Sequence, residues 1–309
     1  MGKNNNRTCC IFNIAPHYRK PIYQAIAEKI NCDFYIGDKM QYEIKTFEYE
    51  ILKGFKKRVH NVHFGKFYWQ RGTVRLLFKP YKYYIIDGEP FCLSSWFILI
   101  LAKLTGKKVI PWTHGWYGRE SAVKRIIKKV FFKMCSKLMV YGEYAISLMR
   151  KEGFAKKEMY CIANSLDSYR HAEMRNQLKK TNIFTVHFKN DYPTILYCGR
   201  IQKSKKLEMI IDCAKKLKDL QSPVNVVIIG KDSENVNLEE YTKKVGLGDS
   251  VWMYGPCYDE TKLGELNSQL KTNFTANAVN AQINWSNGDT TEVDEYASGE
   301  KEAKRSEER

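Results

Sequence analysis

The residues best suited to chemistry follow an apolar run, residues 194–198, in the second half of the chain. A Gly-Arg pair comes directly after this run, and three lysines follow before a helical stretch begins; the cations are Arg200, Lys203, Lys205 and Lys206. Backbone N–H groups at a helix start favour anions, an arginine can grip a phosphate with two hydrogen bonds, and a lysine adds a point charge. The pattern predicts a phosphate-binding loop, with a solvated basic turn as the alternative.

Short apolar runs alternate with longer helical stretches over most of the chain. This alternation predicts an α/β fold of parallel sheets covered by helices, in which ligands bind at the carboxyl ends of the strands. The expected strands are residues 8–14, 33–36, 83–87, 108–111, 137–141, 158–162, 194–198, 225–229 and 250–254. The expected helices are residues 20–30, 93–104, 122–135, 143–152, 206–217, 238–245 and 260–270.

Four further residues stand just after expected strands, where they could line a ligand site. They are His114, Asn164, Gly230 and Gly255. A histidine after an apolar strand would point toward the ligand edge of the sheet, and glycines there let a ligand approach the backbone. The alternatives are a structural histidine and an asparagine that only caps a turn.

In this order the segments resemble glycosyltransferase family 4, whose members have the GT-B fold and transfer a sugar with retention of configuration. The family's "GR…K" element matches residues 199–205, its "vipNgvD" segment matches Cys161–Asp167, and its strand ending in "HG" matches residues 108–115. The resemblance covers about residues 8–270. It implies two Rossmann-like parallel-sheet domains that face a cleft, the second of them truncated.

The resemblance also implies roles for the site residues. Arg200 and Lys205 would contact the diphosphate of a nucleotide sugar, which is a substrate, and no cofactor or metal is needed. The glycines that would keep the backbone close to the nucleotide are Gly199, Gly230 and Gly255. His114 would be a catalytic residue that contacts the sugar near the reacting centre. Lys206 departs from the family, which usually has glycine there.

The segment Ile14–Tyr23 resembles the "p.YR.plf" start of a subset of this family that often builds surface polysaccharide. His17 and Arg19 lie on it. They would line the acceptor or diphosphate side, and Asn164 would line the same cleft. The acceptor would be a polysaccharide or a lipid-linked glycan. The alternative is a turn that Pro16 and Pro21 merely shape.

One element of the family is missing, the E-x7-E pair beside a Gly-rich loop that orients the donor sugar. Glu292 and Glu300 have that spacing, but their surroundings, TEVDEYASGEK, have no apolar helix face and no Gly-rich loop. We reject this match. We therefore expect sugar transfer by this chain to be impaired.

The expected organisation is an N-terminal acceptor domain at 1–166, a linker at 167–192 and a partial nucleotide-sugar domain at 193–270. Residues 271–309 have few large apolar side chains and no helical or strand period, so we expect them to be disordered.

The net charge of +17 fits nucleic acid, an anionic membrane surface or an acidic small substrate. The nine cysteines form no CxxC pair, which indicates reduced thiols, a cytoplasmic protein and no zinc site. No apolar stretch is long enough to span a bilayer. Residues 122–135 interleave cations with apolar residues and could lie on the inner face of a membrane; alternatively, Ile126, Ile127, Val130 and Phe131 pack inward.

Two other functions stay open. A non-catalytic remnant could bind only an acceptor or a membrane. A basic nucleic-acid-binding protein fits the charge, but the chain has no zinc pattern, no clear helix-turn-helix and no RNA-recognition signature, so we expect no nucleic-acid partner.

Overall fold

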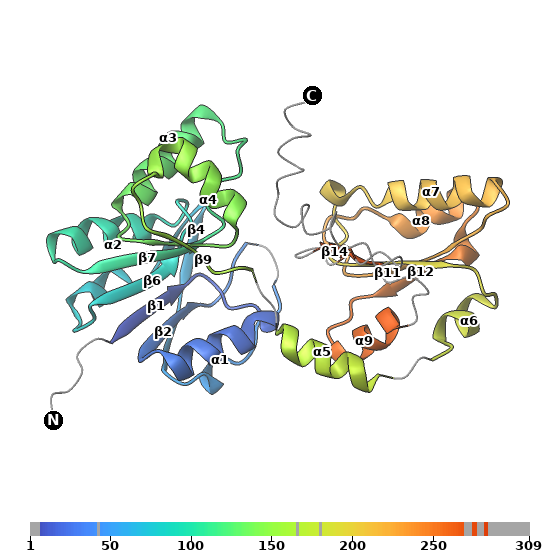
Figure 1. Cartoon of the computed structure of the whole chain (residues 1–309), viewed down its shortest axis with the longest axis horizontal. Coiled ribbons are helices and arrows are strands. Elements are labelled where there is room, and N and C mark those ends of the chain that lie inside the picture. Colours follow the sequence, from blue (N-terminus) through green and yellow to red (C-terminus); the bar gives the residue numbers. More distant parts are fainter. Residues whose placement is uncertain are drawn as a thin grey trace. The chain divides into compact units, whose positions relative to one another are not determined.

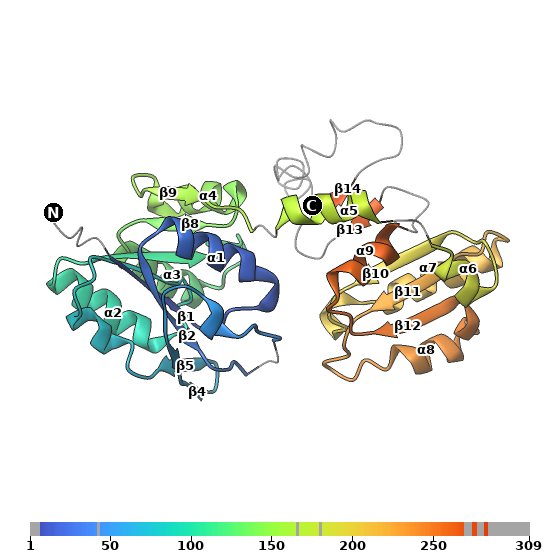
Figure 2. The same cartoon turned by 90° about the horizontal axis from the view of Figure 1, so that it is seen from below.

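The computed structural model describes residues 7–41, 44–164, 167–178, 181–268, 274–276 and 281–283. The chain divides into two compact units, Met1–Asp167 and Ser168–Arg309, and each is described by itself. Figures 1 and 2 show the elements of both units from two directions.

The first unit is built on a seven-stranded sheet in which all neighbouring strands are parallel. The strand order is β3-β2-β1-β6-β7-β8-β9, so the order reverses between β1 and β6. An antiparallel hairpin, β4–β5, lies outside this sheet. The strands are β1 (Thr8–Phe12), β2 (Cys32–Gly37), β3 (Phe55–Val59), β4 (Asn61–Phe64), β5 (Phe67–Gln70), β6 (Tyr83–Asp87), β7 (Lys108–Thr113), β8 (Leu138–Val140) and β9 (Met159–Cys161).

Helices cover both faces of this sheet because the side chains of β1 alternate between two cores. Cys10 and Phe12 pack with Tyr23 and Ala27 of α1 on one face, and Ile11 packs with the other helices on the opposite face. Figure 1 shows α1 on the opposite side of the sheet from the other helices of this unit. The helices are α1 (Lys20–Lys29), α2 (Leu93–Leu104), α3 (Ala122–Met134) and α4 (Glu143–Met149), which continues as a π turn (Arg150–Phe154); 3-10 turns lie at His17–Arg19, Tyr49–Ile51 and Val74–Phe78.

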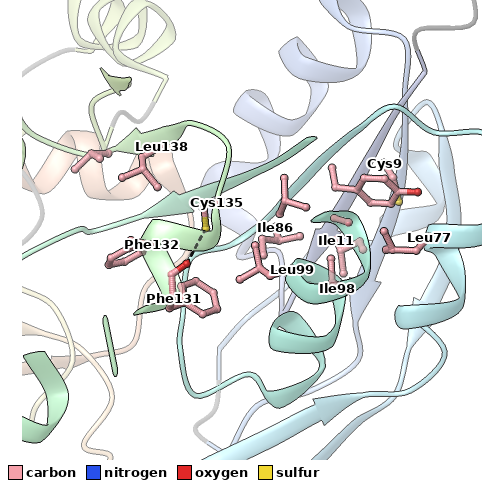
Figure 3. Close-up of a cluster of buried hydrophobic side chains, with 14 of the residues drawn as sticks. Cys9, Ile11, Leu77, Ile86, Ile98, Leu99, Phe131, Phe132, Cys135 and Leu138 are labelled. Atoms are coloured by element: carbon pink, nitrogen blue, oxygen red, sulfur yellow. Dashed lines mark hydrogen bonds between the residues drawn. The ribbon is translucent and has the colours of Figure 1, made fainter. Parts of the chain in front are cut away.

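The larger core of the first unit joins β1 and β6 to α2 and α3. Figure 3 shows Ile11 and Ile86 of the strands beside Ile98 and Leu99 of α2. Cys135, at the end of α3, is buried in this core, and its thiol donates a hydrogen bond to the carbonyl of Phe131. All nine cysteines are free thiols, and the five that are buried pack as small core residues do.

The second unit is a three-stranded parallel sheet with β11 in the centre. One face packs against α7 and α8 and the other against α6 and α9, so every side chain of β11 is buried (Figure 1). The elements are α5 (Ser168–Gln177), α6 (Ile183–Phe188), β10 (Thr194–Cys198), α7 (Glu208–Asp219), β11 (Asn225–Ile229), α8 (Leu238–Lys244), β12 (Val251–Gly255) and α9 (Glu260–Ser268), with 3-10 turns at Lys203–Lys205 and Gly248–Ser250.

The structure confirms the parallel α/β class and reproduces the bounds of the strands expected at 83–87, 194–198 and 225–229. Three strands between residues 55 and 70 were not expected. Helices α5 and α6 lie within residues 167–192, for which the sequence predicted a linker. Phe184 and Phe188 of α6 are buried against the sheet of the second unit, so this segment contributes to a core. Glu292 and Glu300 lie outside the described residues.

The stretch from 271 onward was expected to hold no regular structure. Within its described part, β13 (Phe274–Ala276) and β14 (Ala281–Ile283) form a short antiparallel pair. The remaining residues of that stretch lie outside the described ranges, so the expectation of disorder is tested only at these two strands.

The inward packing considered for residues 122–135 is wrong for part of α3. Phe131 and Phe132 are buried, but the side chains of Ile126 and Val130 are 63% and 47% exposed. The helix is anchored to the core by its last turn, and the apolar face of its earlier turns faces outward.

The helix expected at 206–217 begins two residues later, because Lys206 has a left-handed backbone with φ of 49° and ψ of 47°. The left-handed backbone conformation costs a residue with a Cβ atom about 1 kcal/mol of conformational free energy, and it costs glycine almost nothing. The chain therefore makes, with a lysine, a turn for which glycine is the better residue.

We predict that Lys206→Gly raises the free energy of unfolding of the second unit by up to about 1 kcal/mol, because it removes this strain. Urea unfolding measures the effect. The matched control is Lys216→Gly, at an exposed position inside α7, which should lower the same quantity by about 1 kcal/mol. Equal destabilisation by both variants would contradict the role given to the left-handed turn.

Candidate functional site

Three glycines meet at the carboxyl edge of the sheet in the second unit. The Gly199 N–H donates to the Ile229 carbonyl over 2.9 Å, and the Gly230 N–H donates to the Gly255 carbonyl over 3.0 Å. A Cβ atom on Gly230 would lie 1.9 Å from the Gly199 carbonyl oxygen, a distance that no side chain permits. The structure thus brings together Gly199, Gly230 and Gly255, and leaves backbone without side chains along this edge.

The predicted phosphate-binding cations lie next to this edge. Arg200 follows Gly199 and is exposed, and its carbonyl accepts a 2.9 Å hydrogen bond from the Tyr197 hydroxyl. Lys205 is exposed in the 3-10 turn Lys203–Lys205. No carboxylate in the described ranges forms an ion pair with Arg200 or Lys205. Both charges are therefore available to an anion from solvent.

A carboxylate from the neighbouring loop holds the turn between these cations. Glu234 accepts a 3.0 Å hydrogen bond from the Lys203 N–H and a 3.3 Å hydrogen bond from the Gln202 amide. The loop that bears Glu234 is itself fixed, because Asp232 accepts hydrogen bonds from the N–H groups of Glu234 and Asn237. The backbone of the basic turn is thus held in place before any ligand arrives.

In the first unit, Tyr141 brings together three of the predicted residues. The Arg19 guanidinium donates to the Tyr141 hydroxyl over 2.6 Å and to the Asn164 amide oxygen over 2.5 Å. The ring of His114 lies 4.4 Å from the ring of Tyr141, edge to face. Arg19, Asn164 and His114 therefore form one cluster, whose members follow β7, β8 and β9 or start α1.

His17 lies two residues before Arg19 in sequence and contacts Lys45 and Tyr18. Its Nδ1 atom lies 3.1 Å from the Lys45 carbonyl, and its ring packs against Tyr18 at 5.6 Å.

The electrostatic surroundings favour a neutral His114. Burial lowers the pKa of His114, and the nearby charges of Arg19 and Lys128 lower it further. Lys128 also fixes the turn after the histidine, because its ammonium donates to the Gly115 carbonyl over 2.8 Å and to Glu120 over 2.7 Å. A neutral imidazole in this position can donate one hydrogen bond and accept another.

A second group of polar residues, beside the cluster around Tyr141, lies at the carboxyl ends of β1 and β6 and was not predicted from the sequence. The backbone N–H of Asn13 donates a hydrogen bond to the Asp87 carboxylate. The side-chain amide of Asn13 donates a 3.3 Å hydrogen bond to the Glu89 carboxylate. Burial raises the pKa of Asp87 to about 7 and also raises that of Glu89. The sequence contained one signal that could have identified these carboxylates: Asp87 ends a predicted strand, and Glu89 follows two residues later.

Two negative findings apply to the described part of the chain. It holds no group of three or more His, Cys, Asp or Glu side chains that could bind a metal ion. None of its helices has the length and apolar character needed to cross a bilayer.

Comparison with protein families matches residues 179–274 to the model for glycosyl transferases group 1. This range contains all of the glycines and cations described above for the second unit. No curated protein matches the chain.

Solved structures share the fold over most of the chain at low sequence identity. HepE of Anabaena in complex with UDP is 11% identical, with a TM-score of 0.60 over 86% of this chain and 72% of that one. The lipopolysaccharide outer core galactosyltransferase WaaB is 14% identical, with a TM-score of 0.51 over 95% and 78%. A UDP-N-acetylglucosamine 2-epimerase is 10% identical, with a TM-score of 0.50 over 86% and 73%.

These likenesses establish the fold. The chain has the α/β fold with parallel sheets that is found in GT-B glycosyltransferases, and residues 179–274 match the model for glycosyl transferases group 1. Because an epimerase shares the fold, the choice of reaction depends on the residues of the site.

Proposed function

We propose that this chain is a glycosyltransferase that takes a sugar from a nucleotide diphosphate and passes it to a glycan or lipid-linked acceptor, with transfer impaired because the E-x7-E element beside a Gly-rich loop is missing. The observation that carries the proposal is the edge formed by Gly199, Gly230 and Gly255, next to two cations that have no carboxylate partner in the described ranges. Such an edge suits a diphosphate, which needs close backbone approach and positive charge.

The proposed chemistry uses Arg200 and Lys205 on the leaving group. As the bond between the sugar and the diphosphate breaks, negative charge grows on the diphosphate oxygens. Fixed cations that contact these oxygens stabilise the transition state more than the ground state. The turn held by Glu234 would keep Arg200 and Lys205 in place without reorganisation during the reaction.

The finer parts of the proposal follow the resemblance to glycosyltransferase family 4. They are a hexosyl donor, retention of configuration and no metal ion. His114 would contact the sugar as a neutral imidazole, in keeping with the lowered pKa that burial and two cations give it. A uridine nucleotide is the first donor to test, because the similar HepE structure is a complex with UDP and the similar epimerase is named for a UDP sugar.

For the acceptor we propose a surface glycan, bound in part by Arg19 and Asn164. Their hydrogen bonds to each other and to Tyr141 hold the guanidinium in one orientation. Arg19 also lies over the rings of Tyr141 and Trp112, at 5.0 Å and 5.8 Å. A cation held by neutral and aromatic groups keeps its charge available to a polar acceptor.

We further propose that the chain works at the cytoplasmic face of a membrane. The support is the outward apolar face of α3, where Val123, Ile126 and Val130 are exposed. The same helix carries five cations, three of which form ion pairs with Glu120 or Glu152. The adjoining helix α2 adds an exposed Leu104, at 78%. Apolar side chains ringed by cations suit the interface of an anionic bilayer.

The diphosphate site is tested by thermal unfolding in the presence of UDP, GDP and ADP. We expect one of these nucleotides to raise the melting temperature of the unmodified chain. Arg200→Ala should weaken binding of that nucleotide about tenfold to a hundredfold, since a charge-assisted hydrogen bond contributes about 1.5–3 kcal/mol.

The matched control is Lys244→Ala, which removes an exposed cation at the end of α8 and changes the net charge of the chain equally. It should leave nucleotide binding unchanged. Equal weakening by Arg200→Ala and Lys244→Ala would mean that only the overall charge attracts the nucleotide. No shift with any of the three nucleotides would contradict the proposed function.

The membrane surface is tested by co-sedimentation with vesicles. We expect binding to vesicles that contain phosphatidylserine, weaker binding at high salt, and little binding to neutral phosphatidylcholine. The double variant Ile126→Ser, Val130→Ser should lose about 2 kcal/mol of binding free energy, roughly thirtyfold, because two apolar side chains no longer enter the interface. Val186→Ser, at a position 64% exposed on α6, is the control and should bind normally. Loss in the control and the double variant alike would rule out this face.

A further inference from the structure

A pocket of about 240 Å³ opens on the face of the first unit's sheet that carries α1. Strands β7 and β8 contribute Trp112 and Met139 to its lining, and α1 contributes Ile26. Eight of the ten lining residues are apolar, and the two polar ones are Arg19 and Asn164. All ten belong to the first unit, and the proposed function gives the pocket itself no role.

The pocket exists because α1 covers only part of this face of the sheet. The core on this side joins α1 to β1 and β2, and α1 is the one α-helix of the described ranges that contributes to it. In β7 and β8, Val109 and Leu138 are buried on the opposite face, whereas Trp112 and Met139 on this face are half-buried. The apolar surface that folding leaves open here is available to an apolar ligand.

The guanidinium of Arg19 adds a positive charge to this apolar lining. It is half-buried and donates to the Tyr141 hydroxyl and the Asn164 amide oxygen, which are both neutral. A guanidinium has five N–H groups, so these two hydrogen bonds leave three for a ligand. No carboxylate of the described part of the chain forms an ion pair with Arg19. Asp87 attracts it over a longer distance, but burial raises the pKa of Asp87 to about 7, so this group is only partly ionised at pH 7.

A second donor on the pocket wall has no acceptor. The indole N–H of Trp112 is buried, and no residue of the described ranges accepts a hydrogen bond from it. The guanidinium of Arg19 lies 5.8 Å from the centre of the same indole ring. Buried donors without acceptors are unfavourable, so this end of the pocket suits a ligand that brings acceptor oxygens and negative charge.

The two properties together indicate an amphiphile with an anionic head. Free phosphate would leave the apolar walls in contact with water, and an uncharged lipid alcohol would leave the guanidinium without an anion. A fatty acid has both parts, but its carboxyl group loses its charge when a sugar is esterified to it. A phosphate that joins a lipid to a sugar keeps a negative charge, so a lipid phosphate fits both the pocket and an acceptor that carries a glycan.

We propose that this pocket binds the apolar chain of a lipid-linked acceptor, and that Arg19 binds the phosphate between the chain and the glycan. The inference rests on the proposed function, because it names the acceptor class of that reaction. It makes a lipid-linked glycan a better acceptor than the same glycan free in water.

The test is isothermal titration calorimetry of the full chain with farnesyl phosphate, farnesol and inorganic phosphate, each below the concentration at which it aggregates. We expect farnesyl phosphate to bind at least tenfold more tightly than farnesol, since only the phosphate can form charge-assisted hydrogen bonds with Arg19. Inorganic phosphate should bind more weakly than either, because it buries no apolar surface. This comparison uses the unmodified chain and so does not depend on the folding of a variant.

Two variants with matched controls locate the ligand. Arg19→Gln should weaken farnesyl phosphate binding about tenfold or more and leave farnesol binding unchanged, whereas Arg71→Gln, at an exposed position of the same unit, should change neither. Ile26→Ser should weaken the binding of both lipids about tenfold, because it removes part of the apolar wall. Ile100→Ser, at a position 47% exposed on α2, is its control and should bind both normally.

The α3 double variant Ile126→Ser, Val130→Ser distinguishes the pocket from the proposed membrane surface. It should bind farnesyl phosphate as the unmodified chain does. Loss of binding in this variant, with normal binding by Ile26→Ser, would place the lipid on α3 and overturn the inference. Melting temperatures of all variants show whether lost binding is lost folding.

UDP binding, measured on the same samples, separates this inference from the proposed function. Normal UDP binding without farnesyl phosphate binding would overturn the inference and leave the donor site standing. Equal affinity for farnesyl phosphate and farnesol would mean that the phosphate has no partner, and equal affinity for inorganic phosphate would mean that the chain has none. Equal weakening by Arg19→Gln and Arg71→Gln would show that only net charge attracts the lipid. Each of these three results would also overturn the inference.

Discussion

The backbone of Gly230 lies so close to the carbonyl of Gly199 that no side chain fits between them. This contact exists because β10 and β11 are parallel and end at the same edge, where their loops must pass each other. The same constraint places the N–H of Gly230 on the carbonyl of Gly255. The result is an edge of backbone without side chains, and Arg200 and the basic turn follow directly after its first glycine.

The carboxyl ends of the parallel strands in the first unit differ from this glycine edge. There the residues that follow the strands carry side chains, and these side chains hold one another. Arg19, Tyr141 and Asn164 form one hydrogen-bonded group, and Asn13 orients two carboxylates beside it. Bare backbone suits a diphosphate and oriented polar side chains suit a glycan, so the two edges match the two substrates of the proposed reaction.

The sequence was most informative where local pattern and tertiary packing agree. The fully buried strand β11 contains the apolar run 226–229, glycines follow β10 and β11 directly, and a glycine ends β12. The sequence could not reveal the short strands β3, β4 and β5, because the exposed, charged face of β3 and the partly exposed hairpin carry little apolar period. Helix α6 was not predicted because it is only six residues long and its core residues Phe184 and Phe188 lie within a mostly polar segment.

Among the site residues, a position just after a predicted strand was a better guide to a place in the site than the residue type was. His114 and Asn164 were expected to lie near a ligand edge. In the structure the His114 ring packs against Tyr141, and Arg19, which is 122 residues from Tyr141 in sequence, donates hydrogen bonds to both Tyr141 and Asn164. Such a contact leaves no local signal. The pair Asp87 and Glu89 gave only a strand end and two acidic residues, and their shared partner Asn13 is 74 residues distant from Asp87.

The central claim is that a nucleotide diphosphate lies against the glycine edge of the second unit. Titration of the ¹⁵N-labelled full chain with UDP, followed through the backbone amide signals, tests it most directly. The amides of Gly199, Arg200, Gly230 and Gly255 should shift together, with one dissociation constant. Shifts confined to the first unit, or none at these glycines at saturating UDP, would contradict it.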